Sequence, residues 1–301
     1  MVDATHILGL CAEIGKASIA VHYNCRMKAH PAKSLFPLLE KRHGLLVPRI
    51  QQLPPSGSRP LTVLGHVAGW ITPRATRALA SLEGARIEPE AVCIEPVTAG
   101  QRRSVNQVLA EAALLMRDAG CLRAWRDELL DVIGEGKTLG AIERAAIRPL
   151  GMLTRAVHLN AWTPDGRLWI ALRSATKSTD PGMWDSLVGG LAVAGETLDT
   201  SLLRESHEEA GLLPEHLAQR SELRIILRMH RRLPEGYQVE DVLVSECVLD
   251  ESVPMGNLDG EVAEIRAAPI EEVWELIQEG RFTVEAELVV LESLIRRLTL
   301  Q

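Results

Sequence analysis

The stretch that decides the fold runs from residue 190 to residue 212 and reads GLAVAGETLDTSLLRESHEEAGL. Its carboxylates at Glu205, Glu208 and Glu209 are spaced i, i+3 and i+4, so on a helix all three project from one face. The opposite face is small or apolar and could pack on a core. Like charges at this spacing cost an isolated helix a few tenths of a kcal/mol. A divalent cation bound between them would remove that penalty.

A glutamate-rich helix is usually a solvated acidic face, but the residues around this one indicate something more specific. Gly190, Glu196, Arg204 and Gly211 complete the pattern Gx5Ex7REUxEExGU, in which U is a bulky aliphatic residue. This pattern resembles the Nudix box, the signature of a family that hydrolyses nucleoside diphosphates linked to another moiety and related pyrophosphates. One position departs from it, because Ser206 stands where the box usually has an aliphatic residue.

The resemblance implies both a fold and a set of roles. The fold class is α+β: a Nudix α/β/α sandwich with a mixed sheet, preceded by a smaller α+β domain. In the family, the three glutamates of the box bind Mg²⁺ or Mn²⁺ and serve catalysis. Gly190 lies where a backbone carbonyl often joins the metal ligands. Arg204 and Glu196 would form a structural ion pair that ties the loop to the helix.

The chemistry follows from charge. A pyrophosphate repels an attacking water unless cations lie between them, and a carboxylate-held metal can activate that water and neutralise the departing oxygens. The proton acceptor could be a box glutamate or a loop acid such as Glu261. Glu261 could equally be a turn residue that leads into a strand.

Other stretches resemble one Nudix subfamily, which includes the segment fused to fungal thiamine pyrophosphokinase and free-standing plant and yeast hydrolases. They are residues 143–145, 151–160 and 181–190 and the run Val67-Ala68-Gly69-Trp70. The likeness spans roughly residues 60–300. It implies hydrolysis of thiamine diphosphate or its oxidised analogues to the monophosphate and phosphate.

Contacts to the substrate can be nominated by chemistry alone. Arg173 and Lys177 follow a predicted strand and could pair with phosphate oxygens, while Trp184 could stack on a heteroaromatic ring. Each has a simpler interpretation, as an exposed loop cation or a core tryptophan. His158 is more typical of a core histidine than of a ligand.

Three other functions remain open. An isopentenyl diphosphate isomerase resembles Nudix proteins but needs a cysteine near the site, and none lies between residues 157 and 211. A pyrophosphatase for ADP-ribose or nucleoside diphosphates would carry the same box. A non-catalytic Nudix-fold sensor would be expected to have lost box carboxylates, and all are present here.

We expect an N-terminal α+β domain over residues 1–145, with no clear pattern in residues 1–60, and a Nudix domain over residues 146–301. In the first, the sequence predicts a strand at 63–71, a helix capped by Ser104, and a second helix through Trp125 and Ile133. In the second, Thr163-Pro164-Asp165-Gly166 predicts a hairpin turn between two strands. The strands predicted there are 157–162, 168–172, 223–229, 242–248 and 262–266, and the helices are 198–210, 270–278 and 284–298.

Composition agrees with a globular protein. The chain has 301 residues, of which 46% are hydrophobic and 24% charged. It has no run of roughly 18 apolar residues and no basic leader, so a cytoplasmic protein without a membrane partner is expected. The five cysteines form no CxxC pair and should be reduced thiols.

Charge is uneven along the chain. Residues 1–150 hold 19 Lys and Arg against 14 Asp and Glu, a net charge of +5, while residues 151–301 hold 14 against 26, a net charge of −12. The acidic half favours a cation and a small diphosphate over a nucleic acid polymer. The sequence indicates no oligomeric state.

Overall fold

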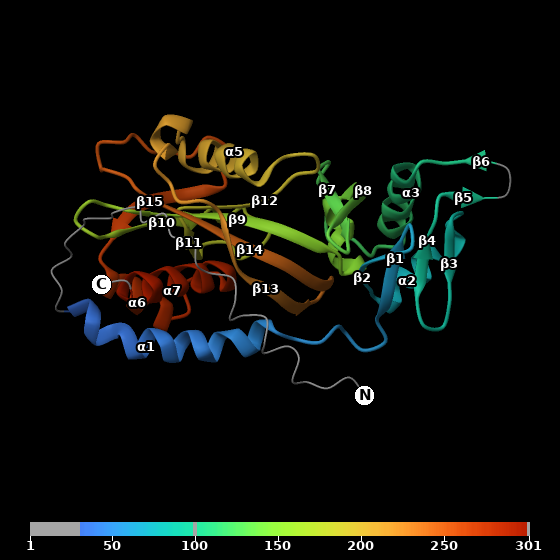
Figure 1. Cartoon of the computed structure of the whole chain (residues 1–301), viewed down its shortest axis with the longest axis horizontal. Helices are drawn as coiled ribbons and strands as arrows, with labels where there is room; N and C mark the ends of the chain where they lie inside the picture. The colour runs from blue at the N-terminus through green and yellow to red at the C-terminus, as the bar shows by residue number, and fades with distance from the viewer. Residues whose placement is uncertain (1–30, 99–100, 300–301) are drawn as a thin grey trace.

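The computed structural model describes residues 31–98 and 101–299. The elements form two sheets along the length of the molecule (Figure 1). A four-stranded sheet lies at one end, and a seven-stranded sheet with helices on both faces occupies the rest.

The smaller sheet has the strand order β2-β1-β4-β3 and is covered by α2 and α3. Its strands are β1 (Arg59–Val63), β2 (His66–Ile71), β3 (Ala85–Ile87) and β4 (Val92–Ile94), and the helices are α2 (Pro73–Ala78) and α3 (Val105–Asp118). Two further ribbons are β5 (Val97–Thr98) with β6 (Gln101–Arg102), and β7 (Leu129–Gly134) with β8 (Lys137–Glu143). Short 3-10 helices cover Val47–Ile50, Leu79–Ser81, Arg144–Ala146 and Pro214–Leu217.

Helix α3 begins where its capping residue predicts. The Ser104 hydroxyl accepts a hydrogen bond from the Gln107 backbone N–H at 3.2 Å, and the Gln107 side chain accepts one from the Ser104 N–H at 2.8 Å. This reciprocal pair satisfies two N–H groups that the first helical turn leaves unpaired.

Two predictions in this part were wrong. The run at 63–71 is not one strand but two, β1 and β2, joined at Leu64-Gly65, where both residues have positive φ. The predicted helix through Ile133 is strand β7, which pairs with β8 across Glu135-Gly136, at φ 50° and 79°. Two consecutive residues with positive φ form the tight turn whose twist matches a hairpin, so the turn decides the structure in both places.

The larger sheet is mixed, as predicted for an α/β/α sandwich. Its path is β11-β10-β9-β14-β13, with β12 beside β9 and β15 beside β10. Only β14 runs parallel to its neighbour β9. The strands are β9 (Leu153–Trp162), β10 (Leu168–Arg173), β11 (Trp184–Ser186), β12 (Val188–Leu191), β13 (Arg224–Leu233), β14 (Gly236–Val248) and β15 (Val262–Ala268).

Helices cover both faces of this sheet. Helix α5 (Leu198–Ala210) packs on one face, and α6 (Ile270–Gln278) and α7 (Val284–Thr299) pack on the other (Figure 1). The predicted strands and helices of this half are confirmed. The predicted hairpin is confirmed only next to its turn. Strands β9 and β10 pair solely at Leu168 and Trp162, and the rest of β10 pairs with β11 and β15 instead.

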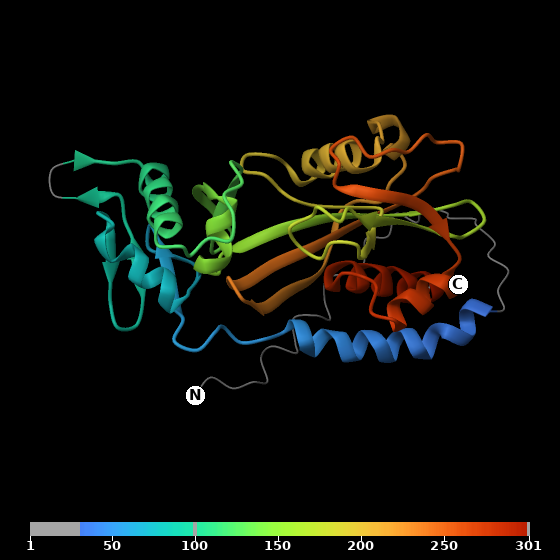
Figure 2. The ribbon, with the colours of Figure 1, turned by 180° about the vertical axis from the view of Figure 1, so that it is seen from behind.

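Helix α1 (Pro31–Leu46) belongs with the larger sheet although it precedes the smaller one in sequence. It runs beside α6 and α7 in both views (Figures 1 and 2). Leu39, Leu46 and Ile50 are buried in the same core as α7, and Arg42 Nε donates to Glu287 at 2.6 Å. The predicted first domain therefore does not hold residues 35–50 in its own core.

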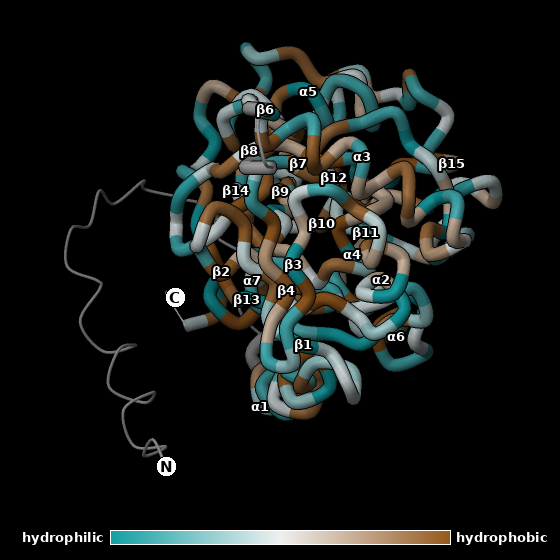
Figure 3. The backbone as a smooth tube through the Cα atoms, turned by 90° about the vertical axis from the view of Figure 1, so that its right-hand side faces the viewer, coloured by the Kyte–Doolittle hydropathy of each residue, from teal (hydrophilic) through white to brown (hydrophobic). Residues whose placement is uncertain are grey.

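Hydrophobic segments run along the central strands, whereas hydrophilic ones lie mainly in the outer loops (Figure 3). The two sheets meet at a glycine contact. The Trp70 N–H donates to the Gly151 carbonyl at 3.2 Å, and a Cβ on Gly69 would lie 2.5 Å from the Leu150 carbonyl oxygen. This contact joins β2 to the end of α4 (Ile147–Leu150), directly before β9.

No helix within residues 31–98 and 101–299 is long and apolar enough to cross a bilayer. In the same residues Cys93, Cys121 and Cys247 are free thiols, as predicted. Cys11 and Cys25 lie outside the described residues.

Candidate active site

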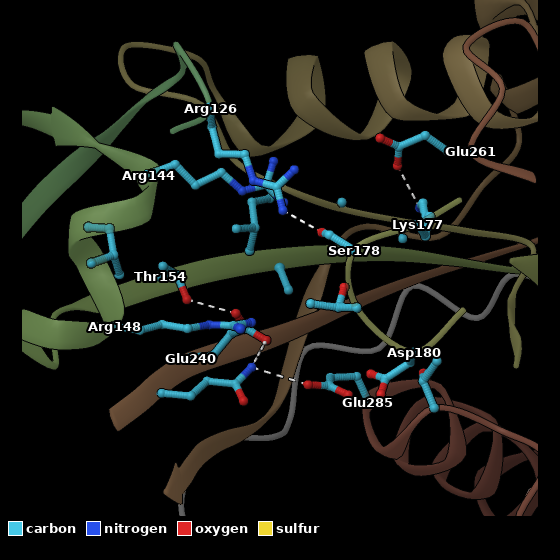
Figure 4. Close-up of a pocket in the computed structure, with 18 of the residues that line it drawn as sticks. Arg126, Arg144, Arg148, Thr154, Lys177, Ser178, Asp180, Glu240, Glu261 and Glu285 are labelled. Atoms are coloured by element: carbon cyan, nitrogen blue, oxygen red, sulfur yellow. Dashed lines mark hydrogen bonds and ion pairs between the residues drawn. The ribbon is translucent and has the colours of Figure 1, made fainter. Parts of the chain in front are cut away.

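A cavity of about 810 Å³ lies between the box helix and the segment that joins the two sheets. Gly190, Leu191, Arg204, Glu205 and Glu208 line it from the Nudix-like box. Residues that precede β9 also line it, as does the loop at 176–181. Figure 4 shows Arg126, Arg144 and Arg148 on one side of this space, with Lys177 and Glu261 across it. The cavity therefore places carboxylates and cations around one volume.

The box helix α5 has the bounds that its sequence predicts. The Thr197 hydroxyl caps its start by accepting from the Thr200 N–H at 3.1 Å, and Gly211 ends it with φ 66°. Ser206, the position that departs from the family pattern, is fully buried. The buried face of the helix thus keeps its packing role with a smaller side chain.

The box glycine has a steric reason to be there. A Cβ on Gly190 would lie 2.0 Å from the Glu205 carboxyl carbon, so any other residue would collide with that carboxylate. Strand β12 and helix α5 consequently approach closely at this point. The Gly190 backbone and the Glu205 side chain are in contact, as a shared ligand site requires.

Arg204 is the centre of the charge network. It donates to Glu196 at 3.2 Å, which is the structural ion pair that the box predicts. It also donates to Glu205 at 2.9 Å and to Glu208 at 3.0 Å. One guanidinium thus holds two of the three glutamates as well as the loop.

The third glutamate has a different cation. Glu209 accepts from Lys177 Nζ at 2.9 Å and from the Gly189 N–H at 2.9 Å. Lys177 also lies 2.6 Å from Glu261. The predicted phosphate contact Lys177 therefore joins the box to the loop that carries the candidate base.

Burial sets the proton affinity of these groups. It raises the pKa of Glu205 to about 7, because Arg204 offsets only part of the desolvation of the carboxylate. Burial also raises the pKa of Glu209, against the opposing effect of Lys177. Glu261 has a pKa below its usual value, since Lys177 outweighs the effect of burial. The cations near Glu205 and Glu209 therefore do not fully offset the cost of burying these carboxylates.

Carboxylates are donors that suit a hard divalent cation in kind, and Glu205 and Glu208 line the cavity with Gly190, whereas Glu209 does not line it. Across the described parts of the chain, no three His, Cys, Asp or Glu side chains converge on a common point for an ion. Arg204 and Lys177 occupy the oxygens that an ion would take. Metal binding would therefore displace these two cations from the carboxylates.

Arg173 lines the cavity, but its guanidinium is already paired with other groups of the protein. Its guanidinium donates to Asp185 at 2.9 Å and to the Thr179 carbonyl at 2.8 Å. It therefore holds the loop at 176–181 against β11.

Trp184 is not brought to the cavity. Its side chain is buried in the core beneath the sheet, and the Arg266 guanidinium lies 4.6 Å from its ring centroid. It is absent from the residues that line the cavity. The core position follows from β11, where Trp184 pairs with Leu172 and faces inward.

Comparison with known families agrees with this geometry. Residues 152–287 match the family model described as the NUDIX domain. The chain contains a NUDIX domain. That stretch includes the whole box, the loop with Lys177, and Glu261.

Two curated proteins are similar to parts of this chain. Nudix hydrolase 20 of Arabidopsis thaliana, described as chloroplastic, is 30% identical over 198 residues, which cover 64% of this chain and 52% of that protein. An isopentenyl-diphosphate Delta-isomerase of Streptomyces avermitilis is 35% identical over 98 residues, covering 32% of this chain and 50% of that protein. The chain spans about half the length of the curated relatives it matches.

Among solved structures, DR0079 from Deinococcus radiodurans aligns with a TM-score of 0.42 at 22% identity. The alignment covers 55% of this chain and 98% of that one.

Several cavity residues were missed by sequence reasoning because they lie outside the box or before the NUDIX domain. Arg126 donates to Ser178, Arg144 pairs with Glu128 at 2.6 Å, and Arg148 pairs with Glu235 at 2.7 Å. The excess positive charge of residues 1–150 was the sequence feature that could have indicated these arginines. On the NUDIX side, the missed residues are Thr154, His158, Gln238, Glu240 and Glu285.

No cysteine of the described ranges lines the cavity of the NUDIX domain. Burial raises the pKa of the Cys247 thiol to about 12, which leaves it protonated at neutral pH. The described residues therefore place no cysteine thiol at the cavity for the chemistry expected of an isomerase.

Proposed function

We propose that the chain hydrolyses a phosphoanhydride bond in a small organic diphosphate, with Mg²⁺ or Mn²⁺ as cofactor. The observation that carries this proposal is the composition of one cavity. Glu205 and Glu208 of the box line it from α5, and Arg126, Arg144 and Arg148 line it from the segment before β9. Carboxylates for a metal and guanidinium groups for phosphate oxygens are thus within one volume.

Glu205, Glu208 and Glu209, with the Gly190 carbonyl, would hold the metal. When bound, a divalent cation supplies an activated water and offsets the charge of the departing phosphate. The arginines would orient the diphosphate and balance its oxygens, since planar guanidinium groups bind phosphate through paired N–H bonds. Lys177, released from Glu209, would face the same oxygens.

The proton of the attacking water has two candidate acceptors, a box glutamate and Glu261. Glu261 lines the cavity and is ionised, because Lys177 lowers its pKa. The same contact, at 2.6 Å, makes it a weaker base. Glu261 can accept a proton effectively only after Lys177 has moved to the substrate.

For the substrate we propose thiamine diphosphate or an oxidised analogue, supported by the resemblance of residues 143–145, 151–160 and 181–190 to the thiamine-linked subfamily. The alternative is ADP-ribose or a nucleoside diphosphate. A cavity of about 810 Å³ accommodates either, so its size does not favour the smaller ligand. A non-catalytic sensor is the third possibility, and the complete set of box carboxylates argues against it.

The test is a phosphate-release screen of the purified chain with Mg²⁺ and Mn²⁺. The panel holds thiamine diphosphate, its oxidised analogues, ADP-ribose and nucleoside diphosphates, and pyrophosphatase activity toward ADP-ribose is read as release of AMP. Glu208→Gln is the matched inactive control, because its side chain is 43% exposed and the change should leave the fold intact. Turnover of no compound by the native chain would refute the proposal, and tight binding without turnover would favour the sensor.

A further inference from the structure

The cavity has a second acidic region that the box does not include. Glu240 of β14 and Glu285 at the start of α7 line it and are buried or nearly so. In Figure 4 they lie below the long strand that crosses the view, whereas Lys177 and Glu261 lie above it. We call Gln238, Glu240, Glu285 and His158 the acidic floor. None of its members belongs to the box.

Hydrogen-bond acceptors outnumber donors in the acidic floor. Gln238 Nε2 donates to Glu240 at 3.0 Å and to Glu285 at 3.1 Å, which uses both of its N–H groups. The Thr154 hydroxyl donates to Glu240 at 2.8 Å. These side chains give the two carboxylates three short donor contacts, and Glu285 also accepts from its own backbone N–H, although each carboxylate can accept several hydrogen bonds.

Two buried polar atoms in the acidic floor have no partner among the described residues. They are Gln238 Oε1 and His158 Nε2, and both residues are at most 5% exposed and line the cavity. His158 Nδ1 contacts the Ser186 hydroxyl at 3.0 Å, so the histidine is anchored on its other side. Buried polar atoms are normally paired, so such atoms on a cavity wall indicate a ligand group.

The acidic floor also keeps negative charge. Burial raises the pKa of Glu240, and Glu285 raises it further. For Glu285, Arg231 and Gln238 outweigh burial, so its pKa lies below the usual value. At neutral pH the floor therefore holds at least one carboxylate charge, which Arg231, at 3.6 Å from Glu285, and Arg148 offset only in part.

On the basis of the hydrolysis proposed above, we infer that the acidic floor binds the organic part of the diphosphate and selects a nitrogen heterocycle with N–H donors or positive charge. Such a ring supplies the donors that Gln238 Oε1 and the two carboxylates lack. A hydrocarbon group in the same position would leave these acceptors desolvated and unpaired, which is strongly unfavourable. The cavity would thus bind phosphate at its arginines and a donor ring at its acidic floor.

The first experiment measures kcat/KM for phosphate release from two probes with similar diphosphate groups. Thiamine diphosphate carries an aminopyrimidine and a cationic ring, and isopentenyl diphosphate carries an uncharged hydrocarbon. We expect the native chain to prefer the first. Glu240→Gln and Glu285→Gln should each lower kcat/KM for thiamine diphosphate about tenfold or more, mainly through KM, and should not lower it for isopentenyl diphosphate.

Glu287→Gln is the matched control, because Glu287 is a buried carboxylate on the same helix that contacts Arg42 and does not line the cavity. It should leave the preference unchanged. Equal losses for both probes in the floor variants, with unfolding temperatures near that of the native chain, would overturn the inference.

The second experiment needs no variant and no turnover. Calorimetry in EDTA compares binding of thiamine monophosphate and isopentenyl monophosphate to the native chain. Tighter binding of thiamine monophosphate supports the acidic floor as a ring site even if no diphosphate is hydrolysed, in which case only the proposed function fails. Equal or weaker binding of thiamine monophosphate overturns the inference while leaving the hydrolysis proposal intact.

Discussion

Glu205 should make the metal-free protein less stable as the pH rises. Its side chain is 14% exposed, and burial raises its pKa from 4.5 to about 7. The folded state therefore binds a proton that the unfolded state releases between these pH values, so the free energy of unfolding falls across this window and levels off above pH 7. Raising the pKa from 4.5 to about 7 corresponds to about 3 kcal/mol. Glu205→Gln should remove this loss.

The assay is urea unfolding in EDTA at pH 5, 6, 7 and 8, for the native chain, Glu205→Gln and Glu208→Gln. The last is the matched control, since its side chain on the same helix is 43% exposed. Added Mg²⁺ should restore stability to the native chain most strongly at pH 8, where the carboxylate is charged. Equal pH dependence in the native chain and Glu205→Gln would show that Arg204 already compensates this charge, and the reasoning would be refuted.

Four further outcomes are expected. Hydrolysis should require a divalent cation, and full activity in excess EDTA would contradict the metal role. Glu208→Gln or Glu209→Gln should lose well over tenfold in kcat with the fold retained by circular dichroism, so near-native turnover in saturating Mg²⁺ would remove that residue from the site. Lys177→Met should destabilise the metal-free protein by about 3 kcal/mol, because Glu209 then keeps a buried charge without its cation. Added Mg²⁺ should raise the unfolding temperature of this variant more than that of the native chain. Lys137→Met, at an exposed position, is the control and should show neither effect. Thiamine diphosphate or an oxidised form should have a higher kcat/KM than ADP-ribose, and a tenfold preference for ADP-ribose would refute the subfamily assignment alone.

The box helix could be predicted to the residue because both of its ends carry local signals. Thr197 caps the first turn, and Gly211 adopts the left-handed conformation that ends the last. The ion pair of Arg204 with Glu196 follows from the family pattern. These features depend on residues close together in sequence, which is where sequence patterns are informative.

Strand β7 shows the opposite case. Its apolar residues at 129, 130, 132 and 133 fit a helix as well as a strand, and the turn at Glu135-Gly136 decides between them. The acidic floor could not be predicted from the sequence, because Glu240 lies beside Thr154 only through the parallel pairing of β14 with β9 in that register. Pairing between distant strands is a tertiary property that a single sequence does not display.

The packing of α1 against α7 has a consequence for synthesis of the chain. Arg42 and Glu287 are 245 residues apart, so α1 leaves the ribosome long before its partner exists. At roughly 5–20 residues per second, the delay is roughly 12–50 s. During that time the apolar side chains of Leu39 and Leu46 have no core to enter. A nascent or prematurely terminated chain would therefore present this helix to chaperones, and the core beneath the larger sheet closes only after α7 has been synthesised.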